Sequence, residues 1–208
     1  MIKRLRQLYS DLAKCWAEGI RAYTMLSAAA FFLLFLIFFA LGFLFPELQD
    51  RFFGMTQSSM ASSGIIQEDG SIDAAMLLSN NISACGFIML YGFLPFIRFP
   101  ALALGTNAMV MGCTAVWYCQ NSFSLLVFAA GILPHGIVEL PAMFLAFGTG
   151  LYICNNVSRR IRKDASALGP WSCMVILARV HLLVLIPLLT AAAMLETYVT
   201  PRVLELFA

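Results

Sequence analysis

Apolar residues are gathered into long, nearly uninterrupted runs along this chain, with polar residues between the runs. A helix needs about 20 apolar residues to cross the roughly 30 Å of hydrocarbon in a bilayer. Each run is near or above that length, so the pattern predicts an all-α membrane protein with about five transmembrane helices. The expected spans are residues 24–45, 74–97, 101–119, 123–153 and 174–196.

The composition agrees with this pattern. Of the 208 residues 61% are hydrophobic and only 12% are charged, which predicts that the lipid bilayer is the main partner. The net charge of +2 is explained by membrane insertion and gives no indication of nucleic-acid binding. The six cysteines lack metal-binding spacing and lie mostly in the spans, so free thiols are expected.

The basic residues predict the orientation. They gather before the first span, between the second and third, and between the fourth and fifth; these are Lys3, Arg4, Arg6, Lys14, Arg21, Arg98, Arg159, Arg160, Arg162 and Lys163. Because such segments stay in the cytoplasm, we expect the N-terminus inside and the C-terminus outside. The first run follows 23 partly charged residues and has no convincing cleavage site, so we expect it to be a retained anchor.

Two segments lie outside the expected spans. Residues 1–23 form a basic, amphipathic cytoplasmic segment, either an interfacial helix on the inner leaflet or an extension that supplies only positive charge. Residues 24–208 are expected to form a single polytopic membrane domain. Within it, the outer loop at 46–73 contains a serine-rich stretch at 58–64 and a turn-like stretch at 68–71. That composition favours a flexible linker over a docking surface for an extracytoplasmic partner.

The fourth span is unusually long. If straight, its 31 residues would reach roughly 46 Å, more than a bilayer requires. Pro134 and Pro141 each remove a backbone donor, and Gly136 lowers the cost of irregular geometry. We therefore predict that this helix is kinked or broken.

The same span carries His135 and Glu139, which are neighbours on one helix face because they are four positions apart. An ionisable side chain at membrane depth costs about 2.5 to 3.5 kcal/mol, so it marks a candidate functional site. Asn80, Asn81 and Asn107 are further amides at depth that need partners. In the fifth span Arg179 is expected to reach the inner headgroups.

Three interpretations of the His135 and Glu139 pair stay open. The pair could lock a broken helix by hydrogen bonding, or handle protons or ions. It could also join His181, roughly 10 Å into the membrane by helical rise, in a set of two imidazoles and a carboxylate suited to a transition metal. That set would serve an intramembrane metal-dependent hydrolase. The sequence shows no recognisable catalytic set, which leans against an enzyme without excluding one.

The residues described so far resemble the stage II sporulation protein M family of polytopic membrane proteins. The most specific part is the run from Pro134 to Ala142, with Pro134, His135, Gly136, Glu139, Leu140 and Pro141 as its motif residues. Weaker parts are Asn80 and Asn81 opening the second span, and Gly105, Asn107 and Gly112 in the third. The resemblance is poorest at 46–73 and after Glu196.

This resemblance implies a protein of the bacterial or archaeal cytoplasmic membrane. In endospore formers such proteins work in a complex with two cell-wall-degrading enzymes during engulfment, and relatives also occur in organisms that do not sporulate. We therefore expect a scaffold that positions cell-envelope or peptidoglycan-remodelling partners. The alternative is a small transporter or channel-like subunit that uses an intramembrane His and Glu relay.

Overall fold

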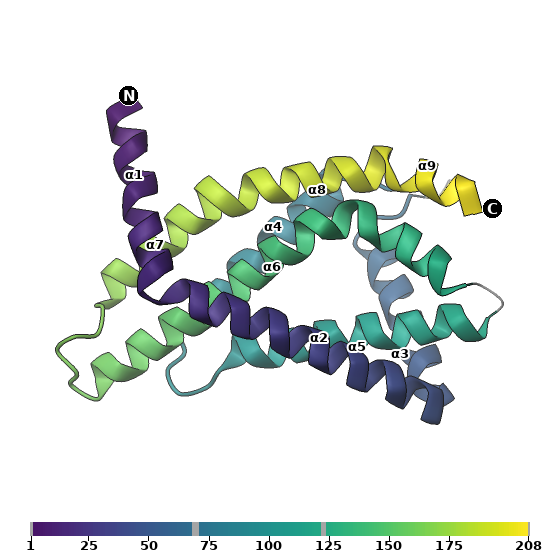
Figure 1. The fold of residues 1–208 in the computed structure, drawn as a ribbon, viewed down its shortest axis with the longest axis horizontal. Coiled ribbons are helices and arrows are strands. Elements are labelled where there is room, and N and C mark those ends of the chain that lie inside the picture. Colours follow the sequence, from purple (N-terminus) through teal and green to yellow (C-terminus); the bar gives the residue numbers. More distant parts are fainter. Residues whose placement is uncertain (1, 68–70, 122–123, 208) are drawn as a thin grey trace. The chain divides into compact units, whose positions relative to one another are not determined.

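The structure is a computed structural model that describes residues 2–67, 71–121 and 124–207. Within these ranges the chain is helical apart from turns and one isolated bridge between Ile66 and Ile72. The predicted all-α architecture is therefore confirmed (Figure 1). The helices are α1 (Ile2–Cys15), α2 (Arg21–Leu44), α3 (Pro46–Ser62), α4 (Ala74–Leu90), α5 (Phe99–Gln120), α6 (Leu125–Ile161), α7 (Pro170–Val180), α8 (Ile186–Tyr198) and α9 (Thr200–Leu204).

Five stretches of helix in the described chain are long and apolar enough to cross a membrane, which agrees with the predicted number. They are Gln7–Leu44, Ala74–Phe93, Phe99–Gln120, Leu125–Ile161 and Pro170–Tyr198. Many large apolar side chains along α2 are exposed, including Leu26, Leu33 and Leu36, each 60% exposed. Such a surface is suited to lipid contact.

The helices α1 and α2 are joined across a kink in the segment Trp16–Ile20, where the backbone of Gly19 is not helical (φ 174°, ψ −34°). Gly19 lies against the ring of Tyr152, where an added Cβ would stand 2.6 Å from a ring carbon. A π-helical segment, His181–Leu185, joins α7 to α8. Such widened turns inside long helices frequently mark functional positions.

Contacts among the described residues divide the chain into two compact units, which are treated separately below. Unit 1 comprises Met1–Ala29, Ile82–Leu104 and Pro141–Leu188, and unit 2 comprises Ala30–Asn81, Gly105–Leu140 and Leu189–Ala208. Each unit therefore combines three separate stretches of chain. Each of the five long apolar stretches contributes residues to both units.

Unit 1 is held by close helix packing at glycines and by polar contacts. A Cβ at Gly92 would collide with the carbonyl oxygen of Gly150, so only glycine fits there. Asp11 of α1 forms an ion pair with Arg179 of α7, at 3.1 Å between carboxylate and guanidinium. Arg179 thus has a carboxylate partner on a neighbouring helix, and its extension to the inner headgroups stays a prediction.

The loop between α6 and α7 is fixed by Asp164 at one end of unit 1. Its carboxylate accepts hydrogen bonds from the hydroxyl and backbone N–H of Ser166 and from the guanidinium of Arg159. These bonds, the Ser166 hydroxyl first, lower the pKa of Asp164 to about 2. The loop is thus ordered by charge-assisted hydrogen bonds at the surface.

In unit 2, α2 and α5 approach closely at Gly112. An added Cβ there would stand 2.8 Å from the carbonyl oxygen of Phe35 and 3.0 Å from the backbone nitrogen of Phe39. Gly105 plays a smaller part, since its nearest neighbour is the Leu34 side chain at 3.9 Å. All six cysteines of the chain are free.

The segment at 46–62 is a helix, so the prediction of a flexible linker is wrong there. Pro46 begins α3 at a position where a missing backbone donor costs nothing. The Phe53 ring then stacks on Trp117 of α5, with ring centroids 3.6 Å apart, and the side-chain amide N–H of Gln49 donates to the side-chain amide oxygen of Gln120. Near the end of the helix, the hydroxyls of Ser58 and Ser62 donate hydrogen bonds to the backbone carbonyls of Met55 and Ser59, three positions earlier, and the helix continues through them.

The helix α4 begins at a capping carboxylate. Asp73 Oδ1 accepts the backbone N–H groups of Met76 and Ala75, at 3.0 and 2.8 Å. The bond from Met76 is the main cause of a pKa of Asp73 below its ordinary value. Asp73 thus ends the segment between the first two spans and begins the second span. The predicted turn residues 68–70 lie outside the described residues.

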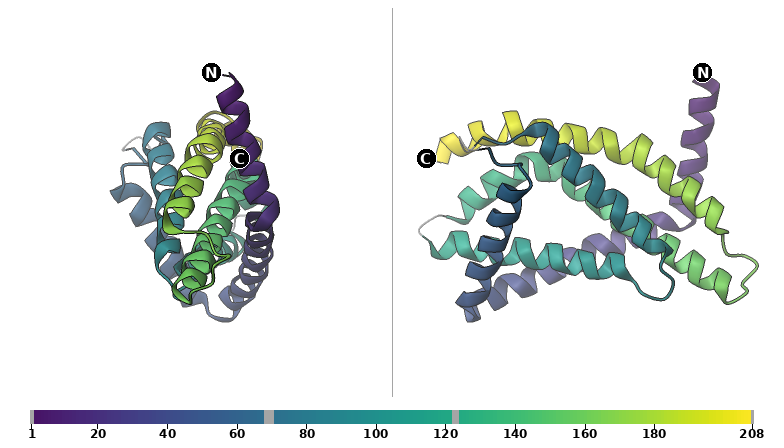
Figure 2. Two further views of the ribbon diagram at one scale, coloured as in Figure 1. Left: turned by 90° about the vertical axis from the view of Figure 1, so that its left-hand side faces the viewer. Right: turned by 180° about the vertical axis from the view of Figure 1, so that it is seen from behind.

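The long helix α6 is continuous from Leu125 to Ile161. Its ribbon is unbroken along this whole range (Figure 1, Figure 2). Of the two predicted forms, kinked or broken, the broken one is therefore wrong, and the kink stays a prediction. The helix contains Pro134 and Pro141, and a proline inside a helix commonly causes a bend.

Candidate intramembrane polar site

The candidate site is built on the part of α6 that belongs to unit 2. Pro134 cannot donate to the carbonyl of Ala130, one turn earlier, so the helix is locally weakened just before His135. Gly136 is buried, and Pro141 is exposed. The polar side chains His135 and Glu139 are both part-buried.

His135 is paired with a carboxylate from another helix. Its Nδ1 contacts Oε2 of Glu196 on α8, and the side chains of both residues are only 17% exposed. The hydroxyl of Thr200, at the start of α9, lies 3.0 Å from the same Glu196 oxygen and 3.4 Å from His135 Nδ1. An imidazole, a carboxylate and a hydroxyl therefore meet at one point in unit 2.

Glu139 has a different partner from His135. Its Oε1 accepts a hydrogen bond of 3.2 Å from the side-chain amide of Asn81 on α4. The sequence suggested that His135 and Glu139 contact each other or share a third group, whereas the structure gives each its own partner. Together the two pairs connect α6 to α8 and to α4 within unit 2.

The other predicted site residues lie elsewhere. Asn80 and Asn107 are exposed on α4 and α5. His181 belongs to unit 1, where its ring lies against Gly86. Among the residues that the structure describes, no group of three or more His, Cys, Asp or Glu side chains could hold a metal ion. The set His135, Glu139 and His181 is therefore not assembled as a ligand group in that part of the chain.

A pocket of about 330 Å³ opens beside the polar cluster of unit 2. His135, Glu196 and Thr200 form part of its wall, and the hydroxyl of Thr114 on α5 is buried there without a hydrogen-bond partner among the described residues. The rest of the wall is largely aromatic and aliphatic, including Phe53, Tyr118 and Phe128. The pocket thus combines an apolar body with a few polar groups, as ligand sites usually do.

Sequence reasoning missed Glu196, Thr200 and Thr114. Glu196 is the last residue of a predicted span, where a carboxylate usually faces water. Its position in the sequence therefore did not indicate a buried partner for His135. One signal was present: Glu196 and Thr200 are four positions apart, on one helix face. The partner of His135 still could not have been identified without knowing which helices are neighbours.

Comparison with known proteins gives one match. The family described as Stage II sporulation protein M matches residues 29–201. The matched region includes both polar pairs and all five long apolar stretches, apart from the beginning of the first. No curated protein and no solved structure match the chain.

Proposed function

Because the chain belongs to the stage II sporulation protein M family, we propose that it is a multi-pass scaffold of the cell membrane. Its role is to position cell-envelope or peptidoglycan-remodelling partners on the outer side. The family membership and the five long apolar helices support a membrane protein. The partners follow from what the family resemblance implies.

The proposal includes an orientation. Basic residues before the first span and between the fourth and fifth keep these segments in the cytoplasm. With the N-terminus inside, α3 lies between the first two spans on the outer side. The carboxylates Glu47 and Asp50 near its start fit this placement, because acidic residues place no constraint against translocation.

The observation that carries the proposal is the ordered helix α3. It lies outside the candidate spans and is fixed to α5 by the Phe53 and Trp117 stack and by the Gln49 and Gln120 bond. Its opposite face is exposed and carries polar residues, among them Arg51, Ser58 and Ser62. A folded helix held in place presents a preorganised surface, which lowers the entropy lost when a partner binds.

The polar cluster of unit 2 supports the same role without chemistry of its own. The His135 and Glu196 pair and the Asn81 and Glu139 bond join three helices. Polar contacts between membrane helices fix their packing, since the apolar faces alone are poorly selective. On this proposal the family motif on α6 holds together the unit that carries α3.

The test is photo-crosslinking in native membranes. A photoreactive residue at Met55 or Ser58, both exposed on α3, should capture a cell-envelope enzyme whose folded part lies outside the membrane. The same group at Ile37 of α2, which is 43% exposed within the first span, should capture lipid. Capture of only lipid or of cytoplasmic proteins from α3 would overturn the proposal.

A second candidate is favoured by the pocket beside His135. A small transporter or channel-like subunit needs ionisable groups next to a cavity in the membrane, and Glu196 and His135 line such a pocket. If this candidate holds, purified protein in proteoliposomes should conduct protons or ions, and Glu196→Gln should reduce the flux at least tenfold. Flux no higher than in empty vesicles would exclude it.

A further inference from the structure

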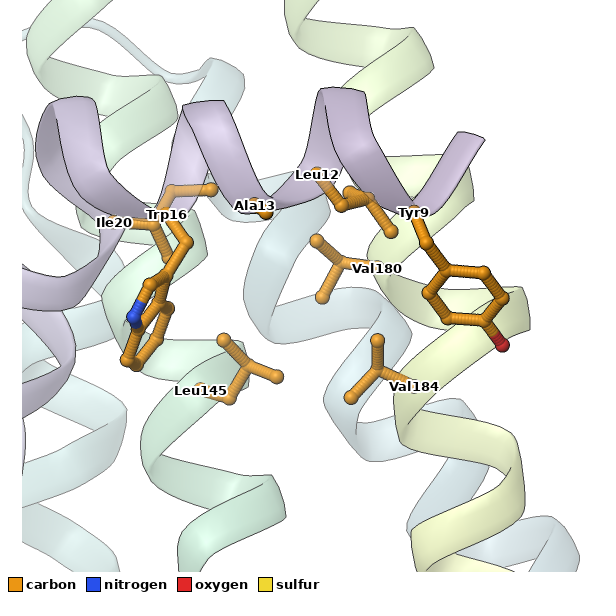
Figure 3. A pocket seen from close by; sticks show the side chains of 8 residues that line it. All are labelled: Tyr9, Leu12, Ala13, Trp16, Ile20, Leu145, Val180 and Val184. Carbon is orange, nitrogen blue, oxygen red and sulfur yellow. The ribbon is translucent and has the colours of Figure 1, made fainter. Parts of the chain in front are cut away.

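Unit 1 contains an apolar groove that neither candidate function uses. Its volume is about 390 Å³, and its wall is made mainly by Leu12, Trp16, Ile20, Leu145, Val180 and Val184. Figure 3 shows Leu145, Val180 and Val184 below the ribbon of α1, between the aromatic rings of Trp16 and Tyr9. The groove therefore lies between α1 and the helices α6 and α7.

Two polar contacts keep α1 beside this groove. Asp11 is paired with Arg179 at 3.1 Å, and the Tyr9 hydroxyl donates to the carbonyl oxygen of Leu183 at 3.4 Å. The kinked segment Trp16–Ile20 adds Trp16 to the wall, and the π segment His181–Leu185 adds Val184. The groove is thus formed by fixed contacts of unit 1, and Trp16 is still 38% exposed within it.

The chemistry of the wall selects a hydrocarbon. A polypeptide strand in the groove would find no partners for its backbone N–H and C=O groups along such an apolar wall. A helix about 10 Å across would fill 390 Å³ with only about one turn. A single acyl chain is narrow, has no polar groups along its length, and fits both limits.

The charge around the groove selects the headgroup. Lys14 and Arg21, both exposed, follow directly on the groove residues Ala13 and Ile20. Residues 1–21 hold five basic side chains against two acidic ones, and Asp11 is already paired. Basic segments at a membrane surface attract anionic lipids, and tryptophan and tyrosine are favoured at the headgroup level.

We propose that the groove between α1, α6 and α7 holds one acyl chain of an anionic phospholipid from the leaflet that adjoins α1. Lys14 and Arg21 attract its headgroup. The proposal rests on unit 1 alone and is independent of the scaffold role of α3. It assigns to the N-terminal helix a lipid-selective site rather than general attachment to the bilayer.

The experiment uses Trp16 as the reporter. The full-length Trp117→Phe/Trp171→Phe variant, in which Trp16 is the remaining tryptophan, is placed in nanodiscs of zwitterionic phospholipid. A small mole fraction of phospholipid with brominated acyl chains is added, with either an anionic or a zwitterionic headgroup. We expect the anionic lipid to quench Trp16 at least threefold more than the zwitterionic one at equal fraction. Equal quenching would overturn the proposal.

Two substitutions separate the groove from the bilayer in general. Val184→Phe fills the groove and should reduce quenching by the anionic lipid to the zwitterionic level. Leu182→Phe is the matched control in the same π segment, 59% exposed and absent from the groove wall, and should leave the difference intact. If Val184→Phe does not fold, Ala13→Leu replaces it. Selectivity that survives groove filling would show that the groove is not the site.

The headgroup part has its own test. The Lys14→Gln/Arg21→Gln variant should lose the anionic preference while zwitterionic quenching of Trp16 is unchanged. A preference that persists in this variant would overturn the assignment of these two side chains to the headgroup.

Discussion

The pairing of His135 with Glu196 makes a quantitative prediction about stability. Glu196→Gln removes the charge but keeps an oxygen that can accept a hydrogen bond. The native carboxylate contacts both His135 and the hydroxyl of Thr200. The side chains of His135 and Glu196 are each only 17% exposed. Hydrogen bonds to charged groups contribute about 1.5 to 3 kcal/mol each, so we expect a loss of about 2 kcal/mol.

The matched control is Glu139→Gln, one helical turn from His135 on the same face of α6. This substitution also removes a carboxylate, but the observed partner of Glu139 is a donor, the Asn81 amide. Since the new amide oxygen can still accept that hydrogen bond, we expect a loss below about 1 kcal/mol. The two isosteric substitutions should therefore differ, although from sequence alone Glu139 is the more conspicuous residue.

Reversible unfolding in mixed detergent micelles measures both values. A double-mutant cycle of His135→Gln and Glu196→Gln should give a coupling free energy of about 1 to 2 kcal/mol, because the two side chains are in contact. The cycle of His135→Gln and Glu139→Gln should give a smaller value. A coupling near zero for the first cycle, or a larger loss for Glu139→Gln than for Glu196→Gln, would refute the assigned partners.

Three further predictions follow from the packing. Gly92→Ala should lower the free energy of unfolding by about 1 to 3 kcal/mol through overpacking, measured as a lower melting temperature. Gly54→Ala, where an added Cβ has nothing within 4 Å, should instead stabilise α3 by up to about 1 kcal/mol. Phe53→Ala should expose α3 to added protease, while Phe53→Tyr, which retains the stack on Trp117, should not. The folded pKa of Asp164 is about 2, against an ordinary 3.8, so its contribution to loop stability is complete above about pH 4 and is lost as the pH falls toward 2. Hydrogen exchange of the loop that follows Asp164 should therefore rise between pH 4 and pH 2. In the Asp164→Asn variant, exchange should not change over this range.

The five long helices could be predicted because hydropathy alone determines them. In hydrocarbon every backbone polar group must be satisfied within the chain, so long apolar runs have few alternatives to helix. The same reasoning failed for α3, because its serine-rich end suggests a linker by composition. Its order depends on Phe53 stacking on Trp117, a contact between residues 64 positions apart in sequence. Tertiary packing of this kind has no local signal.

The polar site was predicted only in part for a related reason. The cost of burying ionisable groups correctly marked His135 and Glu139 as needing partners. Depth and spacing could not say which helices lie beside α6, so the sequence paired these two with each other. Glu196 was overlooked because a carboxylate at the end of a span needs no special explanation. The neighbours of α6 had to come from the three-dimensional structure.

The composition of each unit from three separate stretches of chain has a consequence for biosynthesis. The stretch Leu189–Ala208 completes unit 2, and Glu196 lies in it. His135 therefore precedes its carboxylate partner by 61 residues in synthesis, and their pair forms only once the last stretch packs onto α6. Until the last span arrives, an imidazole in the bilayer has no ion-pair partner, and its nearest provisional neighbour on the same helix is Glu139.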